Sequence, residues 1–147
     1  MTRLCASVLA MSLICAPASA ATGLSSADEA AVFKAAGFTR TNGQWTRCED
    51  DVTESKTPGS IALEDLNGDG SPEAWVSESS TFCYGATEQA FVLLTKQEGA
   101  WTVLLDEVGA PMSSDTRHHG WPDIEVGGPG FGPFPVFQFN GTKYLRR

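Results

Sequence analysis

Asp65-Leu66-Asn67-Gly68-Asp69-Gly70-Ser71-Pro72-Glu73 is the stretch on which our prediction of the fold rests. Acidic or amide oxygens stand at positions 1, 3, 5 and 9 of this stretch, and a glycine stands at position 6. A hard cation such as Ca²⁺ takes six to eight oxygens from a short, sharply turning loop. We therefore expect one structural Ca²⁺ whose ligands are the side chains of Asp65, Asn67, Asp69 and Glu73 and the backbone carbonyl of Ser71. The alternative is an acidic, glycine-rich turn without an ion.

The flanking residues favour a β-hairpin over an EF-hand. An EF-hand needs a bidentate Glu at position 12 and a helix on each side, but position 12 is Val76, and Pro72 would end a helix. Ile61 and Leu63 alternate with other residues before the loop, and residues 74–77 read as a strand after it. The sequence therefore predicts two antiparallel strands joined by the acidic loop.

In these residues the chain resembles the calcium hairpins of FG-GAP and VCBS repeats, whose pattern is D-x-[DN]-x-D-G-x-x-[DE] followed by an apolar strand. The resemblance implies blade-like antiparallel β-meanders, a bound calcium ion and a role in adhesion or binding. Such repeats usually build closed propellers from several blades. Two units cannot close such a ring, so the resemblance does not imply the complete propeller architecture for this chain.

A second, degenerate copy of the loop follows at an offset of 50 residues. Its residues are Asp115, Arg117, His119 and Asp123, aligned with Asp65, Asn67, Asp69 and Glu73. We expect the Arg117 guanidinium to bind Asp115 and Asp123 and so to replace the ion with a fixed charge. His118 and His119 leave two alternatives open: a transition-metal site with Asp123, or a general base.

The predicted fold is mostly β: two blade-like antiparallel β-meanders, packed together, with one N-terminal helix. Both meanders belong to a single domain, residues 21–147, with pseudo-repeats at about 60–108 and 111–146. The capping box Ser26-Ala27-Asp28-Glu29 and Gly37 predict a helix over about 27–36. We expect the two sheets to pack face to face, or to form one curled sheet, around Ile61, Leu63, Trp75, Val76, Phe91, Leu93, Val103, Ile124, Val126 and Phe137.

Residues 1–20 read as a signal peptide. Arg3 precedes a short apolar run, and Ala18-Ser19-Ala20 is an A-x-A cleavage pattern. We therefore expect cleavage after Ala20 and a periplasmic or secreted protein without a membrane span. The net charge of −8 disfavours nucleic acid as a partner.

Two of the cysteines, Cys48 and Cys83, remain after the signal peptide is removed. In an oxidising compartment they are expected to pair as a disulfide. The alternative is a nucleophilic Cys83 with a histidine base.

The residues favour a binding function over catalysis. The chain has no G-x-S-x-G nucleophile elbow. The expected function is a small calcium-stabilised binding module for a protein or glycan of the cell envelope or outside it. The alternative is an acidic inhibitor or immunity-type protein that covers a basic cell-envelope hydrolase. A hydrolase based on a carboxylate or a histidine is a third and weaker hypothesis.

Overall fold

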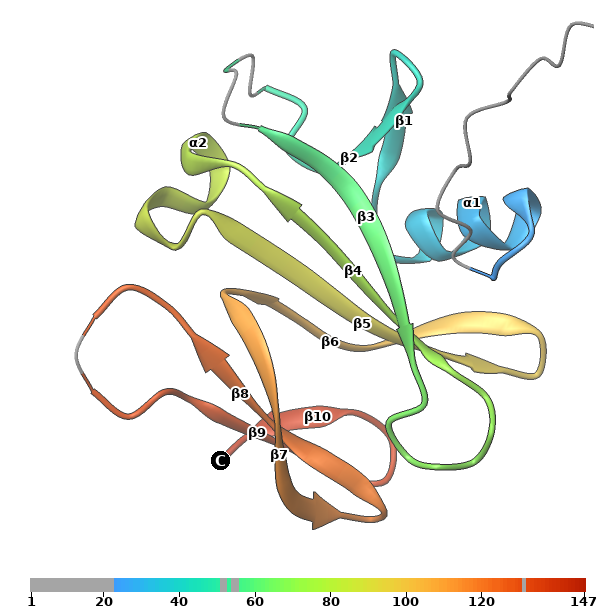
Figure 1. Ribbon diagram of the computed structural model, residues 1–147, viewed down its shortest axis with the longest axis vertical. Coiled ribbons are helices and arrows are strands. Elements are labelled where there is room, and N and C mark those ends of the chain that lie inside the picture. The colour runs from blue at the N-terminus through green and yellow to red at the C-terminus, as the bar shows by residue number, and fades with distance from the viewer. Residues whose placement is uncertain (1–22, 51–52, 54–55, 131) are drawn as a thin grey trace, which may run out of the picture.

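The computed structural model describes residues 23–50, 53, 56–130 and 132–147, so the expected signal peptide and its cleavage site lie outside the described residues. Figure 1 shows three layers. Helix α1 and a small hairpin cover one face of a first sheet, and a second sheet packs on the opposite face. The predicted mostly-β fold of two packed meanders with an N-terminal helix is confirmed.

Each large sheet is a four-stranded antiparallel meander, and its strands follow the order of the chain. The first consists of β3 (Thr57–Glu64), β4 (Glu73–Ser79), β5 (Gln89–Gln97) and β6 (Ala100–Val108). The second consists of β7 (Ala110–His118), β8 (Trp121–Gly127), β9 (Val136–Phe139) and β10 (Tyr144–Arg146). The remaining elements are α1 (Ser26–Ala35), the hairpin of β1 (Thr39–Thr41) and β2 (Gln44–Thr46), α2 (Thr81–Tyr84) and the 3₁₀ turn η1 (Gly85–Thr87).

Helix α1 begins one residue earlier than predicted. Its N-cap is Ser25, whose hydroxyl accepts the Asp28 N–H at 3.1 Å, so the predicted cap at Ser26 is wrong by one position. The helix buries Val32 and Phe33 against the first sheet, and the Asp28 carboxylate meets the Lys96 ammonium at 2.8 Å. This ion pair and the Ser25 hydroxyl hold the pKa of Asp28 below its usual value.

The two faces of the first sheet bury different sets of side chains. Ala74 and Val76 pack toward α1, whereas Trp75, between them in sequence, packs toward the second sheet. This is the period-2 alternation of a strand that is covered on both faces. Ile61 and Leu63 also lie on the helix side, and Val103 is 38% exposed. The prediction that all of these residues share the core between the sheets is therefore wrong.

The core between the two sheets is the larger apolar cluster of the protein. Its buried members are Leu66, Phe91, Leu93, Leu104, Leu105, Trp121, Ile124, Val126, Phe137, Phe139 and Tyr144, with Trp75 packed against them. The chain passes from one sheet to the other through a single residue, Gly109. A Cβ at this position would lie 2.4 Å from Val126 Cγ1, so the close approach of the two sheets requires glycine here.

Three tight turns close hairpins with two residues of positive φ, the arrangement of a type I′ turn. They are Asn42-Gly43, Glu98-Gly99 and His119-Gly120. Helix α2 and η1 connect β4 to β5.

No helix within the described part of the chain is long and apolar enough to cross a membrane.

Candidate functional site

The loop between β3 and β4 is organised by the carboxylate of Asp65. Its Oδ1 accepts the N–H groups of Gly68, at 2.8 Å, and Asp69, at 3.2 Å, and its Oδ2 accepts that of Gly70, at 2.9 Å. Gly68 and Gly70 both have positive φ, which lets successive N–H groups turn toward one carboxylate. The sequence pattern thus produces a chain that curls around its first acidic residue.

Asn67 and Asp69 continue the same network. The Asp69 N–H donates to Asn67 Oδ1, and Asn67 Nδ2 donates to Asp69 Oδ2, both at 2.9 Å. Asp69 Oδ1 accepts the Ser71 N–H at 2.7 Å. Three of the expected calcium ligands are thereby held within one exposed turn.

Glu73 is placed differently from these three side chains. It is only 1% exposed, and its Oε2 accepts the Leu66 N–H while its Oε1 accepts the Thr95 hydroxyl, each at 3.0 Å. Burial raises the pKa of Glu73 above its usual value, and the nearby charges of Asp69 and Asp65 raise it further. Glu73 therefore closes the base of the loop from inside the sandwich instead of joining the exposed oxygens.

The exposed part of the loop fits a hard cation. A carboxylate has about four lone-pair positions and an amide oxygen two, so the hydrogen bonds above leave acceptor capacity on Asp65, Asn67 and Asp69. Among the described residues, no group of three or more His, Cys, Asp or Glu side chains gathers into a metal site. The side-chain oxygens available to Ca²⁺ are thus those of two carboxylates and an amide, and backbone carbonyls would have to complete the coordination.

The second copy of the loop is not a loop. His119 and Gly120 form a two-residue turn, and Asp115 and Arg117 lie in strand β7. Arg117 Nη1 donates to the carbonyls of Leu66, at 2.9 Å, and Gly120, at 2.8 Å. The prediction that Arg117 bridges Asp115 and Asp123 is therefore corrected: the guanidinium ties the turn of the second sheet to the acidic loop of the first. A two-residue turn has no room for the long loop that the aligned sequence suggested.

Asp123 is a buried acid with two side-chain partners. His118 Nδ1 lies 2.6 Å from its Oδ1, and Gln138 Nε2 donates to its Oδ2 at 3.1 Å. His119 occupies the turn, so the two histidines do not converge on Asp123. Sequence reasoning did link histidine with Asp123, but it could not choose between the neighbours.

Glu73 and Asp123 hold matching places in their sheets. Each is a buried acid near the start of the second strand, and each bonds to a residue on the third strand: Thr95 for Glu73 and Gln138 for Asp123. In the strand register, Glu73 and Thr95 stand next to the pair Ala74–Leu94. Asp123 and Gln138 stand next to the pair Ile124–Phe137 in the same way. The same kind of polar contact therefore occurs within each meander, even though the turns between their first two strands differ.

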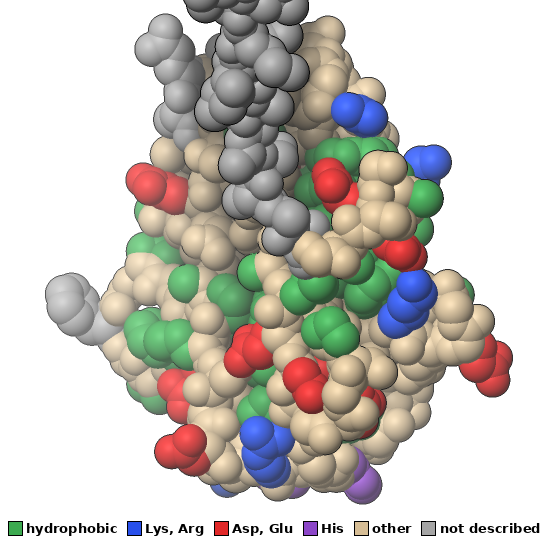
Figure 2. All heavy atoms as spheres, turned by 45° about the vertical axis from the view of Figure 1, so that its right-hand side comes forward, with side chains coloured by type: hydrophobic (Ala, Val, Ile, Leu, Met, Phe, Trp, Pro, Cys, Tyr) green, Lys and Arg blue, Asp and Glu red, His purple; other side chains and the backbone are tan. Residues whose placement is uncertain are grey.

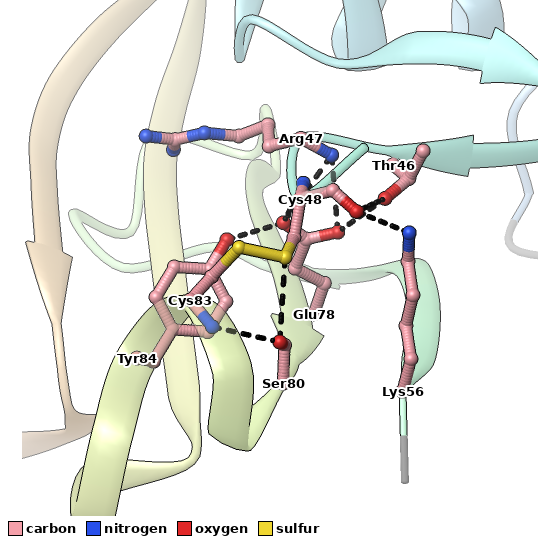
Figure 3. The surroundings of a disulfide bond; sticks show 8 residues. All are labelled: Thr46, Arg47, Cys48, Lys56, Glu78, Ser80, Cys83 and Tyr84. Atoms are coloured by element: carbon pink, nitrogen blue, oxygen red, sulfur yellow. Dashed lines mark hydrogen bonds between the residues drawn. A yellow bond between two sulfur atoms is a disulfide. The ribbon is translucent and has the colours of Figure 1, made fainter. Parts of the chain in front are cut away.

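Figure 3 shows a third buried acid, Glu78, beside the Cys48–Cys83 disulfide. The predicted cysteine pair is confirmed, with Cα atoms 6.1 Å apart. Cys83 N–H and Cys48 Sγ both contact the Ser80 hydroxyl, at 3.0 and 3.3 Å. The bond joins the segment after β2 to the α2 turn.

The Glu78 carboxylate accepts hydrogen bonds from two segments of the chain, residues 46–48 and Tyr84. Its donors are Thr46 Oγ1, Arg47 N, Cys48 N and Tyr84 Oη. Burial and the Glu78 carboxylate together raise the pKa of the Tyr84 phenol. Sequence analysis missed Glu78, although a signal existed: it stands two residues after the buried Val76, on the same face of β4.

The opposite end of the sandwich from the acidic loop carries two hollows. The first, of about 300 Å³, is lined by Glu107, Val108, Val126, Pro133, Phe134 and Pro135, and the second, of about 360 Å³, by Ala86, Thr87, Ala110, Met112 and Phe134. Residues 127–129 line both. We call this surface the connector groove, because the glycine- and proline-rich connector between β8 and β9 forms its rim.

Large apolar side chains of the connector groove reach solvent. Val108 is 50% exposed, Met112 43% and Phe134 39%. Three of the six exposed large apolar side chains among the described residues thus lie around this one groove. Sequence analysis did not identify the connector groove, because the composition of the connector does not reveal which strands it lies against.

The acidic charge, by contrast, is not gathered in one place on the face that Figure 2 presents. Acidic side chains are spread over this face and alternate with a few basic ones. The charge of −8 is therefore not evidence for a single acidic patch there.

Comparison with known proteins finds no matching family model, no similar curated protein and no similar solved structure.

Proposed function

We propose that this protein is a small exported binding module that holds a protein ligand in the connector groove. The observation that carries the proposal is the exposure of Val108, Met112 and Phe134 around two adjoining hollows. Hydrophobic contact surfaces of this kind bind protein segments, whereas a glycan site would present mainly hydroxyl and amide partners. The proposal favours a protein over a glycan for this reason.

The proposal includes one structural calcium ion at the loop 65–73. Asp65, Asn67 and Asp69 would hold it through side-chain oxygens, with the Ser71 carbonyl as a further ligand. Glu73 would act from inside the sandwich by fixing the Leu66 backbone at the base of the loop. The ion lies at the other end of the domain from the groove, so its role here is to stabilise the scaffold and not to contact the ligand. The resemblance of this loop to FG-GAP and VCBS hairpins supports the ion.

Export to the periplasm or the medium is part of the same proposal. The A-x-A pattern before Ala21 and the Cys48–Cys83 disulfide both support it. The intact mass of the exported protein should correspond to a chain beginning at Ala21.

Affinity capture from an envelope extract tests the binding function. The baits are the wild type, a Met112→Ser/Phe134→Ser double variant and Leu145→Ser, which removes an exposed apolar side chain from strand β10. A protein retained by the wild type and by Leu145→Ser, but lost with the double variant, supports the proposal. Equal retention by all three baits contradicts it. If the retained protein is a basic hydrolase whose activity falls on binding, the module is an inhibitor.

A further inference from the structure

The residues around the connector groove also restrict the chemistry of the ligand that fits it. This inference rests on the binding function proposed above. Glu107 lines the first hollow beside Val108, and no lysine or arginine lines either hollow among the described residues. Partial burial raises the pKa of Glu107, the neighbouring Asp106 raises it further, and Arg146 partly offsets the shift. Glu107 is therefore already partly withdrawn from water before any ligand binds.

A second carboxylate, which lines neither hollow, lies on the same face of the second sheet as Met112. Glu125 of β8 is registered opposite Met112 of β7, and side chains of a registered pair point to the same face of the sheet. Asp106, by comparison, is paired with Arg47 at 2.9 Å. Glu107 is thus the carboxylate that lines the groove, and Glu125 lies beside the groove on the Met112 face of the sheet.

An apolar ligand that covers the groove removes water from these carboxylates. Burying a charge without a partner is costly, whereas a lysine or arginine of the ligand would compensate for the lost hydration. The groove also lies against strand β7, which pairs with β8 on one side and has no strand partner on its other side among the described residues. An extended segment suits such a place, because alternate side chains of a strand enter pockets on one side.

We propose that the connector groove binds an extended segment of a basic protein, with two apolar side chains in the two hollows and lysine or arginine beside them, opposite Glu107 and Glu125. Electrostatic selection of this kind speeds association and excludes acidic competitors.

The test is selection from a phage-displayed library of random twelve-residue peptides, followed by calorimetry with synthetic peptides. The expected result is enrichment of peptides that combine two apolar residues with lysine or arginine. The best peptide and its charge-inverted form, with glutamate at each basic position, are then titrated into the wild type, Glu107→Lys/Glu125→Lys, Met112→Ser/Phe134→Ser and Leu145→Ser. Melting curves of each variant verify that it is folded.

The proposal expects the charge-reversed variant to bind the basic peptide at least tenfold more weakly and the inverted peptide more tightly than the wild type does. Met112→Ser/Phe134→Ser should weaken the binding of both peptides at least tenfold, and Leu145→Ser should leave their affinities unchanged. Neutral or acidic peptides that bind the groove, or an affinity insensitive to charge reversal, would overturn the basic ligand and leave the binding function standing. No enrichment, or binding unaffected by Met112→Ser/Phe134→Ser, would overturn the groove as a binding site altogether.

Discussion

Arg117 of the second sheet donates a hydrogen bond to the carbonyl of Leu66, the second residue of the acidic loop in the first sheet, at 2.9 Å. The same nitrogen donates to the Gly120 carbonyl at 2.8 Å. One guanidinium thereby joins the ends of two hairpins that belong to different sheets. Leu66 itself is buried in the core between the sheets, so this contact fixes where the acidic loop begins.

The first prediction follows from this contact. Arg117→Ala leaves the Leu66 carbonyl without its donor, and we expect a loss of about 1–3 kcal/mol in the free energy of unfolding. Urea denaturation measures it, with Arg40→Ala, at an exposed arginine of the β1–β2 hairpin, as the control. If Asp115→Asn restored the stability of Arg117→Ala, the guanidinium would be acting as a counter-charge after all.

The second prediction concerns calcium. At ~1 mM Ca²⁺ and a Kd of ~0.1 mM, near the tight end of extracellular modules, the folded state gains about 1.4 kcal/mol. This corresponds to a rise of a few degrees in Tm for a domain of this size. Asp69→Asn should abolish the difference between calcium and EDTA in thermal melting, whereas Asp115→Asn, with the same change of charge, should keep it. Identical melting of the wild type in both buffers would mean that the loop is an acidic turn without an ion.

The third prediction concerns Glu78. Glu78→Ala removes the acceptor shared by Thr46, Arg47, Cys48 and Tyr84. The N–H groups of Arg47 and Cys48 and the Tyr84 hydroxyl then lose their acceptor in a buried or half-buried place, so we expect a loss of about 3 kcal/mol or more. Urea denaturation of the oxidised protein measures it, and Asp115→Asn, at an exposed carboxylate, should change little. A loss below about 1 kcal/mol would show that the disulfide alone holds this corner.

The fourth prediction concerns Gly59 in strand β3. A Cβ there would lie 2.7 Å from the Phe38 ring and 2.8 Å from the Phe33 ring. Gly59→Ala should therefore overpack the layer between α1 and the first sheet and cost about 1–3 kcal/mol. Gly128→Ala, whose Cβ would meet only Thr87 Oγ1 at 4.0 Å, is the matched control. Equal stabilities of the two variants would contradict this packing.

The fifth prediction concerns pH. The pKa of Glu73 is raised above its ordinary 4.5, chiefly by burial. A raised pKa in the folded state means that folding favours the protonated form of Glu73. The stability that this proton binding contributes is therefore fully present below pH 4.5 and is lost as the pH rises through the folded-state pKa. In EDTA, the stability of the wild type relative to Glu73→Gln should therefore increase as the pH is lowered toward 4.5. If the difference in unfolding free energy between the two proteins stayed constant across this pH range, protonation of Glu73 would not be coupled to folding.

Local structure was predictable from the amino-acid sequence. The alternation of apolar residues produced the strands, Asn-Gly and Glu-Gly produced the tight turns, and the glycines of the acidic loop let its backbone N–H groups reach Asp65. Pairing of Cys48 with Cys83 followed once residues 1–20 were read as a signal peptide, because only these two of the four cysteines then remain. These features depend on neighbours in the chain, and such neighbours are visible in a sequence.

Which surfaces meet depends on the packing of the layers and was not predictable from the sequence. Ile61 and Trp75 both read as core residues, yet one faces the helix and the other faces the second sheet. Arg117 aligned with a calcium ligand, but a two-residue turn placed it in a strand, where its nearest acceptors were carbonyls from two sheets. Glu78 and the connector groove depend on segments that are distant in the sequence. Their contacts are set by how the layers pack, because one strand pattern is compatible with burial against either neighbour.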